Sequence, residues 1–447
     1  MKIPRFTFFA SMAGLTAVLA LGACAQEVPE STIALTGASP HMLLLVGDQD
    51  EQDSDFITVL DVDPGSEKRG QPIGSTPIGY KASMVHHMEY EAPPKGEPVF
   101  MNGHHHELSM IVDIADPANP RIANTFKPPA GLRYPHDYSR TASGTRLVGF
   151  LRGEGASPDP DEAMSPSNHG GIAEYTMEGE LIRSASAAAP GYAKAIRPYA
   201  FAQLPEIDRI TVTSAPMMEQ SWADVVQIYR YSDFKLLHTL DLEVGVDHKG
   251  AAVDGINGAG FGQHVLEDGS IFLNSYGCNF YHLTDIGTDD PQLDLVFSVK
   301  TEPADNPKKI RGACGVPLLK GKYWIQPIGK NQQVVVLDIS NPKTPKEVFR
   351  LDTAEGFAPH WMAKDPRGNR LILGAELGGE QGFYMLRFDD QSGRIEYDPD
   401  FADYRNDSFL NIFRSKSTGY ISLDRKEWPH GATGTAWGHA AVFFDGA

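Results

Sequence analysis

The sequence predicts an all-β protein and, more narrowly, a seven-bladed β-propeller. This prediction depends on a strand pattern that recurs seven times, on a hairpin pattern that begins with histidine, and on the lack of convincing amphipathic helices. Across the 447 residues, 32 prolines and 44 glycines interrupt most stretches that would otherwise suit a helix. Since 41% of the residues are hydrophobic, the chain is able to bury a large core.

The recurring unit is a run of alternating, β-rich residues followed by a polar turn. The seven runs lie about 50 to 60 residues apart, a period typical of propeller blades built from four short strands. Two of the turns, 113–120 and 338–345, are closely alike, and two β-sandwich domains would not explain this repetition. We therefore expect one domain over residues 41–447. The runs occupy residues 58–62, 110–114, 172–176, 226–230, 280–284, 335–339 and 383–387.

A second repeated pattern places a histidine at the start of a hairpin. His136, His264 and His360 each begin a short apolar run, which is followed by a turn with glycine and by a second apolar run. If such hairpins form a ring, their leading side chains gather near its axis. The strand-like residues 440–444 are predicted to pair with the strand that begins near 42–45 and so to close the ring.

The charge of the chain argues against one class of partner. With 58 acidic and 39 basic residues the formal net charge is −19. A nucleic-acid partner is not expected, because nucleic-acid binding needs a basic face.

The first residues have the features of an export signal. Lys2 and Arg5 precede an apolar stretch, 6–21, that is too short for a lasting membrane span. The sequence Leu-Gly-Ala-Cys at 21–24 resembles the lipobox of bacterial lipoproteins. We expect residues 1–24 to be a signal peptide, Cys24 to be lipidated, and 25–40 to be a tether. The protein would then be in the periplasm or outer membrane, lipid-anchored or secreted; the alternative is an ordinary secretory peptide cleaved nearby.

Two cysteines remain if Cys24 is lipidated. In an oxidising compartment Cys278 and Cys314 are a candidate disulfide. Two free buried thiols are the alternative. A paired-thiol metal site is less favoured, because neither cysteine belongs to a C-x-x-C unit.

Fifteen histidines are the main candidates for chemistry. In a propeller the innermost strand of each blade lines the channel, so histidines at strand starts can point into one small volume. Imidazole is a common ligand of copper and zinc, and three or four imidazoles suit such an ion. His169, His264 and His360 are metal candidates of this kind. The alternative for each is a hydrogen-bonded structural side chain, and the run 104–106 is read as one inward histidine with exposed neighbours.

Several motifs occur in the order that one known family shows. A double histidine is followed after a gap by an aromatic residue, in His86-His87-Met88-Glu89-Tyr90. A strand with a Val-Asp core and a proline turn follows at 111–120. His136 then opens a blade, the late pattern 393–401 comes next, and His439 stands in a terminal segment. From about Ser83 to the end, the chain resembles the selenium-binding protein / methanethiol oxidase family.

The resemblance implies a seven-bladed propeller, copper bound by histidines, and oxidation of methanethiol to formaldehyde, hydrogen sulfide and hydrogen peroxide. Transferred by position, it implies His86, His87, His136 and His439 as metal ligands. The sequence departs from the selenium-binding members, which carry a cysteine pair shortly after the double histidine. Residues 88–95 contain no cysteine, which excludes selenium or thiol attachment there.

The sequence therefore suggests an exported, copper-dependent oxidase of a small sulfur compound such as a thiol. Zinc or another transition metal could replace copper. The alternative is a non-catalytic propeller that serves as a metal-binding or protein-interaction module. The sequence assigns no catalytic residue.

Overall fold

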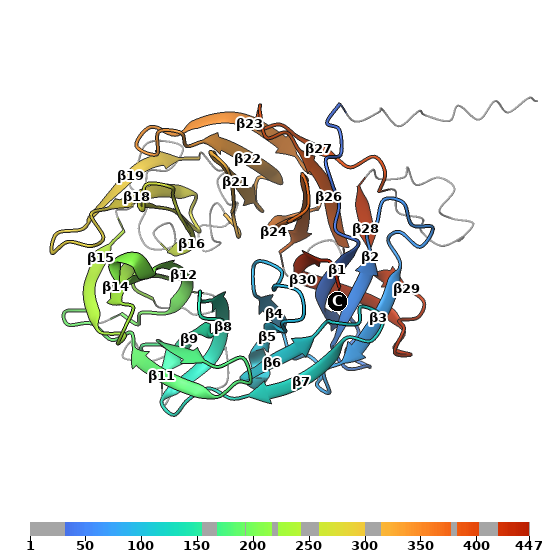
Figure 1. The fold of residues 1–447 in the computed structure, drawn as a ribbon, viewed down its shortest axis with the longest axis horizontal. Helices are drawn as coiled ribbons and strands as arrows, with labels where there is room; N and C mark the ends of the chain where they lie inside the picture. Colours follow the sequence, from blue (N-terminus) through green and yellow to red (C-terminus); the bar gives the residue numbers. More distant parts are fainter. Residues whose placement is uncertain are drawn as a thin grey trace, which may run out of the picture.

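A computed structural model describes residues 32–153, 168–192, 194–216, 222–242, 259–299, 314–376, 382–401 and 419–446. These residues form seven antiparallel sheets arranged in a ring (Figure 1). The predicted seven-bladed β-propeller is thereby confirmed. Within the described ranges, helical structure is limited to the short 3₁₀ turns η1 (His104–His106) and η2 (Pro205–Ile207).

We name each blade after its innermost strand. The first four blades contain, from the axis outward, β4 (Val85–Met88), β5 (Val99–Gly103), β6 (Leu108–Asp113) and β7 (Arg121–Phe126); β8 (Leu132–Arg140), β9 (Arg146–Gly153), β10 (Gly171–Tyr175) and β11 (Leu181–Ser186); β12 (Pro198–Leu204), β13 (Arg209–Ser214), β14 (Val225–Arg230) and β15 (Leu236–Asp241); β16 (Gly260–Val265), β17 (Ile271–Ser275), β18 (Asn279–Thr284) and β19 (Gln292–Ser298).

The remaining blades contain β20 (Leu318–Lys320), β21 (Tyr323–Ile328), β22 (Gln333–Asp338) and β23 (Lys346–Asp352); β24 (Pro359–Lys364), β25 (Arg370–Ala375), β26 (Gly382–Phe388) and β27 (Ile395–Tyr397); β30 (Gly434–Phe444), β1 (His41–Asp48), β2 (Phe56–Asp61) and β3 (Pro72–Pro77). Two further strands add to these sheets, since β28 (Tyr420–Ser422) pairs with β26 and β29 (Asp424–Arg425) pairs with β30.

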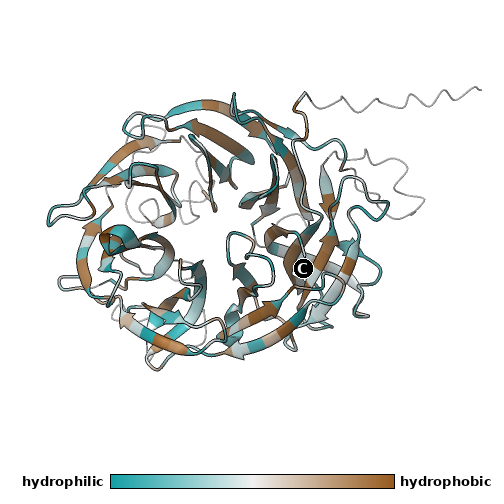
Figure 2. Cartoon of the chain, in the orientation of Figure 1, coloured by the Kyte–Doolittle hydropathy of each residue, from teal (hydrophilic) through white to brown (hydrophobic). Residues whose placement is uncertain are grey.

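The seven runs found in the sequence all belong to the same position in the blade, the third strand from the axis. This strand is covered by neighbouring blades on both faces, so it is almost wholly buried, as in β18 and β26. The outermost strands are partly exposed, as in β7. In Figure 2 hydrophobic colour accordingly concentrates on the strands. The third strand is an apolar, almost wholly buried part of each repeat, which is why the period was visible.

The ring is closed by the two ends of the domain, as predicted. Strand β1 pairs with β30, and its partners include Met42 with Phe443 and Leu43 with Val442. The β30 blade therefore takes its inner strand from the end of the chain and its other three main strands from the beginning (Figure 1). This places His439, on β30, beside the first complete blade.

Residues 32–40 are part of the folded domain and not a free tether. Ser39 is buried, and its backbone N–H and hydroxyl both donate to Asp365 of the β24 blade. Asn369 exchanges hydrogen bonds with this segment, and Arg387 donates to the Ile33 carbonyl. The expectation of a tether over residues 25–40 is therefore wrong for residues 32–40, which pack against the domain. The predicted signal peptide, its Cys24 and residues 25–31 lie outside the described residues.

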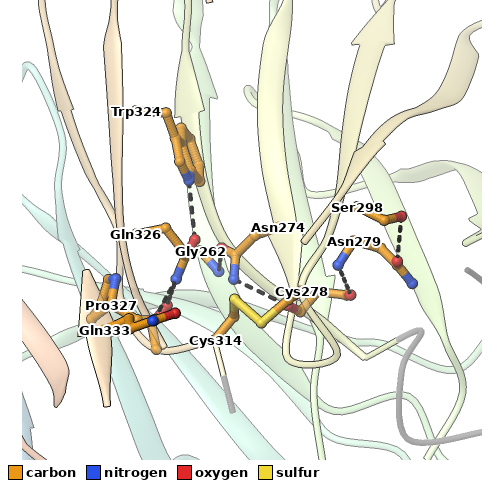
Figure 3. The surroundings of a disulfide bond; sticks show 12 residues. Gly262, Asn274, Cys278, Asn279, Ser298, Cys314, Trp324, Gln326, Pro327 and Gln333 are labelled. Atoms are coloured by element: carbon orange, nitrogen blue, oxygen red, sulfur yellow. Dashed lines mark hydrogen bonds between the residues drawn. A yellow bond between two sulfur atoms is a disulfide. The ribbon is translucent and has the colours of Figure 1, made fainter. Parts of the chain in front are cut away.

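Cys278 and Cys314 form a disulfide, which joins the turn after β17 to the segment that leads into β20 (Figure 3). Both cysteines are buried in an apolar cluster with Phe280 and Trp324. The bond thus connects two neighbouring blades near the channel. None of the helices in the described part of the chain has the length and apolar character that crossing a membrane requires.

Candidate metal centre

The double histidine lies in a β-bulge of the inner strand β4. Val85 pairs with Gly103 and Met88 pairs with Met101, so two residues of β4 face only Asn102 on β5. The Asn102 side-chain oxygen accepts from the backbone N–H groups of His86 (3.1 Å) and His87 (2.9 Å). Its amide nitrogen donates to the Pro135 carbonyl of the next blade (2.9 Å). Because a bulge breaks the in-out alternation of a strand, two consecutive imidazoles can face the channel.

Bulges at the same depth carry the other histidines. On β8 the ladder with β9 shifts between Pro135 and Asp137, which makes His136 the extra residue. The same shift occurs at His360 on β24 and at His439 on β30. The blades β24, β30, β4 and β8 are consecutive in the ring (Figure 1). Four neighbouring blades therefore direct histidines to one side of the channel.

The four predicted ligands lie together. Nitrogen atoms of His86, His87 and His439 lie within 4.8 Å of one another. The ring centroids of His87 and His136 are 4.0 Å apart, and those of His86 and His439 are also 4.0 Å apart. All four side chains are buried. The nitrogen atoms of His86, His87 and His439 are thus close enough to share one ion, and His136 lies beside this group.

The available nitrogen atoms fit a metal better than a hydrogen-bond network. His439 Nδ1 lies 2.8 Å from the His86 carbonyl oxygen, so Nδ1 carries the proton and Nε2 is left as the ligand atom. Most ring nitrogens of the cluster are buried and have no hydrogen-bond partner within the described residues. They are Nε2 of His439, Nε2 of His87, and both nitrogens of His86 and of His136. Buried polar atoms are normally paired, so this many unpaired nitrogens in one place form a donor set that could hold an ion.

Burial also sets the protonation state of the site. It lowers the pKa of His86, His87, His136 and His439 well below 6.5, and the neighbouring histidines lower it further. The imidazoles are therefore neutral at pH 7, which is the form that binds metals.

Two more histidines border the cluster. The His360 ring, one of the further candidates, lies 4.9 Å from that of His439, and its Nδ1 has no partner among the described residues. The ring centroids of His104, on η1, and His86 are 6.2 Å apart. His104 is buried, whereas His105 and His106 are exposed. The run 104–106 thus has one inward histidine, as the sequence indicated.

The other two candidates lie elsewhere. On β16 the bulge contains Phe261 and Gly262 opposite Asn274. Figure 3 shows the hydrogen bond from the Gly262 N–H to Asn274. Phe261 thus occupies the place that histidine has in the β4, β8, β24 and β30 blades. His264 lies beyond the bulge with its Nε2 3.4 Å from the Pro317 carbonyl. His169 accepts a hydrogen bond from the Ile196 N–H. Neither residue belongs to the four-histidine cluster.

Aromatic residues that the sequence did not assign surround the cluster. The Tyr199 ring lies 4.3 Å from that of His136, and Trp361 lies 5.2 Å from His87. Tyr90 stacks on Trp361, and its hydroxyl lies 3.4 Å from His87 Nδ1. Tyr90 belonged to the double-histidine motif and could have been included on that basis. Tyr199 and Trp361 have no local sequence signal.

One carboxyl group lies against this shell. Asp137 follows His136 and is buried, which raises its pKa to about 7, while the Tyr90 hydroxyl offsets part of this rise. Glu89 is held elsewhere, since its two oxygens accept from Arg146 (2.8 Å) and Arg140 (2.7 Å). Glu89 is thus occupied by arginines, whereas Asp137 is a buried acid directly next to a candidate ligand in the sequence.

Comparison of the sequence with known proteins finds one matching family model and one similar protein. A family model described as the LVIVD repeat matches residues 318–353, which are the β20 blade. A methanethiol oxidase from Ruegeria pomeroyi is 29% identical over 187 residues, which is 37% of this chain and 39% of that protein. The chain thus matches less than half the length of this curated relative.

Solved structures share the architecture. A hypothetical selenium-binding protein from Sulfolobus tokodaii has a TM-score of 0.69 at 14% identity, over 92% of this chain and 94% of that chain. A periplasmic gluconolactonase from Pseudomonas aeruginosa has a TM-score of 0.56 at 14% identity, over 80% and 94%. At these identities the likeness concerns the fold alone. Together, the matched methanethiol oxidase and the propeller fold confirm the predicted distant similarity to the selenium-binding protein / methanethiol oxidase family.

Proposed function

We propose that this protein binds a transition metal, copper in the first instance, through His86, His87, His136 and His439, and oxidises a small sulfur compound such as methanethiol. The observation that carries this proposal is the group of buried, neutral imidazoles whose ligand nitrogens lack protein partners. The name of the matched relative, methanethiol oxidase, supports the substrate class. Zinc or another transition metal remains an outcome of the test below.

The donor set suits copper, because imidazole is a ligand that both of its oxidation states accept and three or four imidazoles leave room for a substrate. Copper held by His86, His87, His136 and His439 would supply a binding point for thiolate sulfur and redox chemistry toward dioxygen. Methanethiol, dioxygen and water would give formaldehyde, hydrogen sulfide and hydrogen peroxide, a balance that conserves every atom. This reaction is the one that the family resemblance implies.

Residues of this chain supply the surroundings of the reaction. His360 Nδ1 is buried and has no partner among the described residues, so it is available to accept a hydrogen bond from the thiol. Tyr199 and Phe261, at the bulges of the two blades that follow β8, give the channel an aromatic side whose rings lie 4.2 Å apart. An apolar alkyl group would face these rings.

Export and lipid attachment at Cys24 belong to the same proposal. The sequence of 1–24 supports them, and the Cys278–Cys314 disulfide is compatible with an oxidising compartment. Mass spectrometry of the mature N-terminus from cell envelopes tests this part. An acylated Cys24 is expected, and a Cys24→Ser variant should remain unacylated. An unprocessed N-terminus would contradict it.

The metal is tested on protein purified without a histidine tag. We expect about one metal ion per chain, most of it copper, and oxygen uptake on addition of methanethiol. His87→Ala and His136→Ala should lose the metal and the uptake, whereas His169→Ala, the matched control, should keep both. Equal metal content in all four proteins would contradict the proposed ligand set.

A second candidate function is metal binding without catalysis. The burial of all four imidazoles favours it, because none of them lines the cavity described below. Stoichiometric copper without oxygen uptake from methanethiol would select this function over the oxidase.

A further inference from the structure

A cavity of about 680 Å³ lies at the end of the channel where the inner strands finish. Arg140 and Phe444, the last residues of β8 and β30, and His264, near the end of β16, are part of its wall. The volume is within the range of about 300–1,000 Å³ that is typical of small-molecule sites. Methanethiol has two non-hydrogen atoms, so the cavity is far larger than this substrate needs.

Most charged groups of the wall are already paired. Glu89 binds Arg140 and Arg146, and Glu97 lies 3.1 Å from Arg140. At the rim, Glu91 pairs with Lys364 and Asp445 pairs with Arg367, while Lys95 is exposed. Burial lowers the pKa of His264 to about 4, so this imidazole is neutral at pH 7. An ionic ligand that binds Glu89, Glu97 or Arg140 would have to separate existing ion pairs.

The rest of the wall is largely apolar. Side chains from the β4, β12, β20, β24 and β30 blades meet there, including Ala92, Phe201, Val316, Met362 and Phe444. This apolar part of the wall, beside the paired charges, favours an uncharged organic ligand. The neutral His264 imidazole offers such a ligand one hydrogen-bonding group.

The floor of the cavity faces the candidate metal centre. Tyr90 and Tyr199 both line the cavity, and they also contact His87 and His136, with ring centroids 5.9 Å and 4.3 Å apart. A ligand in the cavity is therefore separated from the histidines by one aromatic ring.

We propose that this cavity is a second binding site, which takes an uncharged, largely apolar organic molecule much larger than methanethiol. The site is formed by the described residues whether or not the histidines hold a metal, so this inference does not depend on the proposed oxidase function.

The test uses the full chain and the neutral dye Nile red, whose fluorescence rises in apolar surroundings. We expect saturable binding of one dye per chain, with and without copper. Ala115→Trp places a large side chain in the wall from an exposed position and should weaken binding at least tenfold. Ala92→Trp, from another part of the wall, should do the same. The matched control, Ala123→Trp on the exposed face of β7, should bind like the wild type.

Two results would overturn the proposal. One is the absence of saturable Nile red binding by the wild-type protein. The other is equal binding by Ala115→Trp, Ala92→Trp and Ala123→Trp, which would locate the dye elsewhere. The anionic dye 8-anilinonaphthalene-1-sulfonate should bind at least tenfold more weakly than Nile red; tighter binding of this dye would contradict the uncharged ligand class.

Discussion

At the scale of single residues, the candidate centre depends on how the backbone of the double histidine is held. Asn102 uses its whole amide group for this purpose, because it accepts from two backbone N–H groups and donates to the neighbouring blade. The histidines themselves are identifiable from sequence. Asn102 is not, because its role arises from a bulge on the strand opposite and from a blade that lies more than thirty residues further along the chain.

Asn102→Ala should weaken both the fold and the metal site. It leaves two buried N–H groups without an acceptor, and such a group costs about 1–3 kcal/mol. We expect a loss of that size in the free energy of unfolding, measured by chemical denaturation, together with a lower metal affinity. The matched control is Asn124→Ala, because Asn124 is exposed and bonds only at the surface. Equal losses in both variants would contradict this role of Asn102.

Asp224 gives a prediction for the dependence of stability on pH. Burial raises its pKa from 3.8 to about 6, although the Trp222 indole donates to it (2.8 Å). Between about pH 4 and pH 6 the unfolded chain ionises before the folded one, so unfolding releases a proton. As the pH rises through this range, the stability of the wild type relative to Asp224→Asn should therefore fall. Above about pH 6 the difference should no longer change with pH. Denaturation at pH 4, 5, 6 and 7.5 measures this, and a difference that is constant with pH would contradict it.

At the scale of elements, the sequence identified the hairpins but treated their histidines as equivalent. His136 and His360 stand eight residues before the turn glycines Gly144 and Gly368, whereas His264 stands five before Gly269. A shift of three residues along a strand is about 10 Å. This difference places His264 outside the bulge and in the cavity wall. The spacing between histidine and glycine could therefore have separated His264 from His136 and His360 in the sequence.

The segment 32–40 illustrates what local patterns do not contain. Its residues show no strand or helix pattern, as expected of a tether, yet its order comes from partners more than 300 residues away. The central contact is the buried ion pair of Asp365 and Arg370, to which Ser39 adds two hydrogen bonds. Only the folded ring brings these groups together.

Asp365→Ala should destabilise the protein strongly. It leaves the Arg370 charge buried without its partner, and breaking a buried ion pair in this way costs about 3–5 kcal/mol. Asp390→Ala removes an exposed pair with Lys320, which is worth about 0–1 kcal/mol, and is the matched control. Chemical denaturation of both variants measures the difference. Similar stabilities would show that residues 32–40 and this ion pair do not support the fold.

At the scale of the whole molecule, the period of the repeats was sufficient to predict the number of blades and the pairing of β1 with β30. Every blade has a buried third strand, and this regular burial leaves a regular pattern in the sequence. The cavity has no such pattern, because its wall combines residues from separate blades, from Glu89 to Gly446. The number of blades was thus predictable, whereas the space at the end of the channel was not.

The disulfide should stabilise the molecule without shaping the candidate centre. Cys278 and Cys314 are 36 residues apart in sequence, and closing a loop of this size contributes about 2–4 kcal/mol. We expect the double variant Cys278→Ser/Cys314→Ser to lose that amount in chemical denaturation and to become insensitive to dithiothreitol. Its metal content should equal that of the wild type. Loss of the metal from this variant would contradict the separation of the two sites.

The central claim is that histidines from separate blades hold one ion. The most direct measurement is anomalous diffraction at the copper edge from crystals of copper-loaded, untagged protein. We expect a single strong peak within bonding distance of nitrogen atoms of His86, His87, His136 and His439. A peak at the exposed histidines His105 and His106, or no peak in the channel, would contradict it.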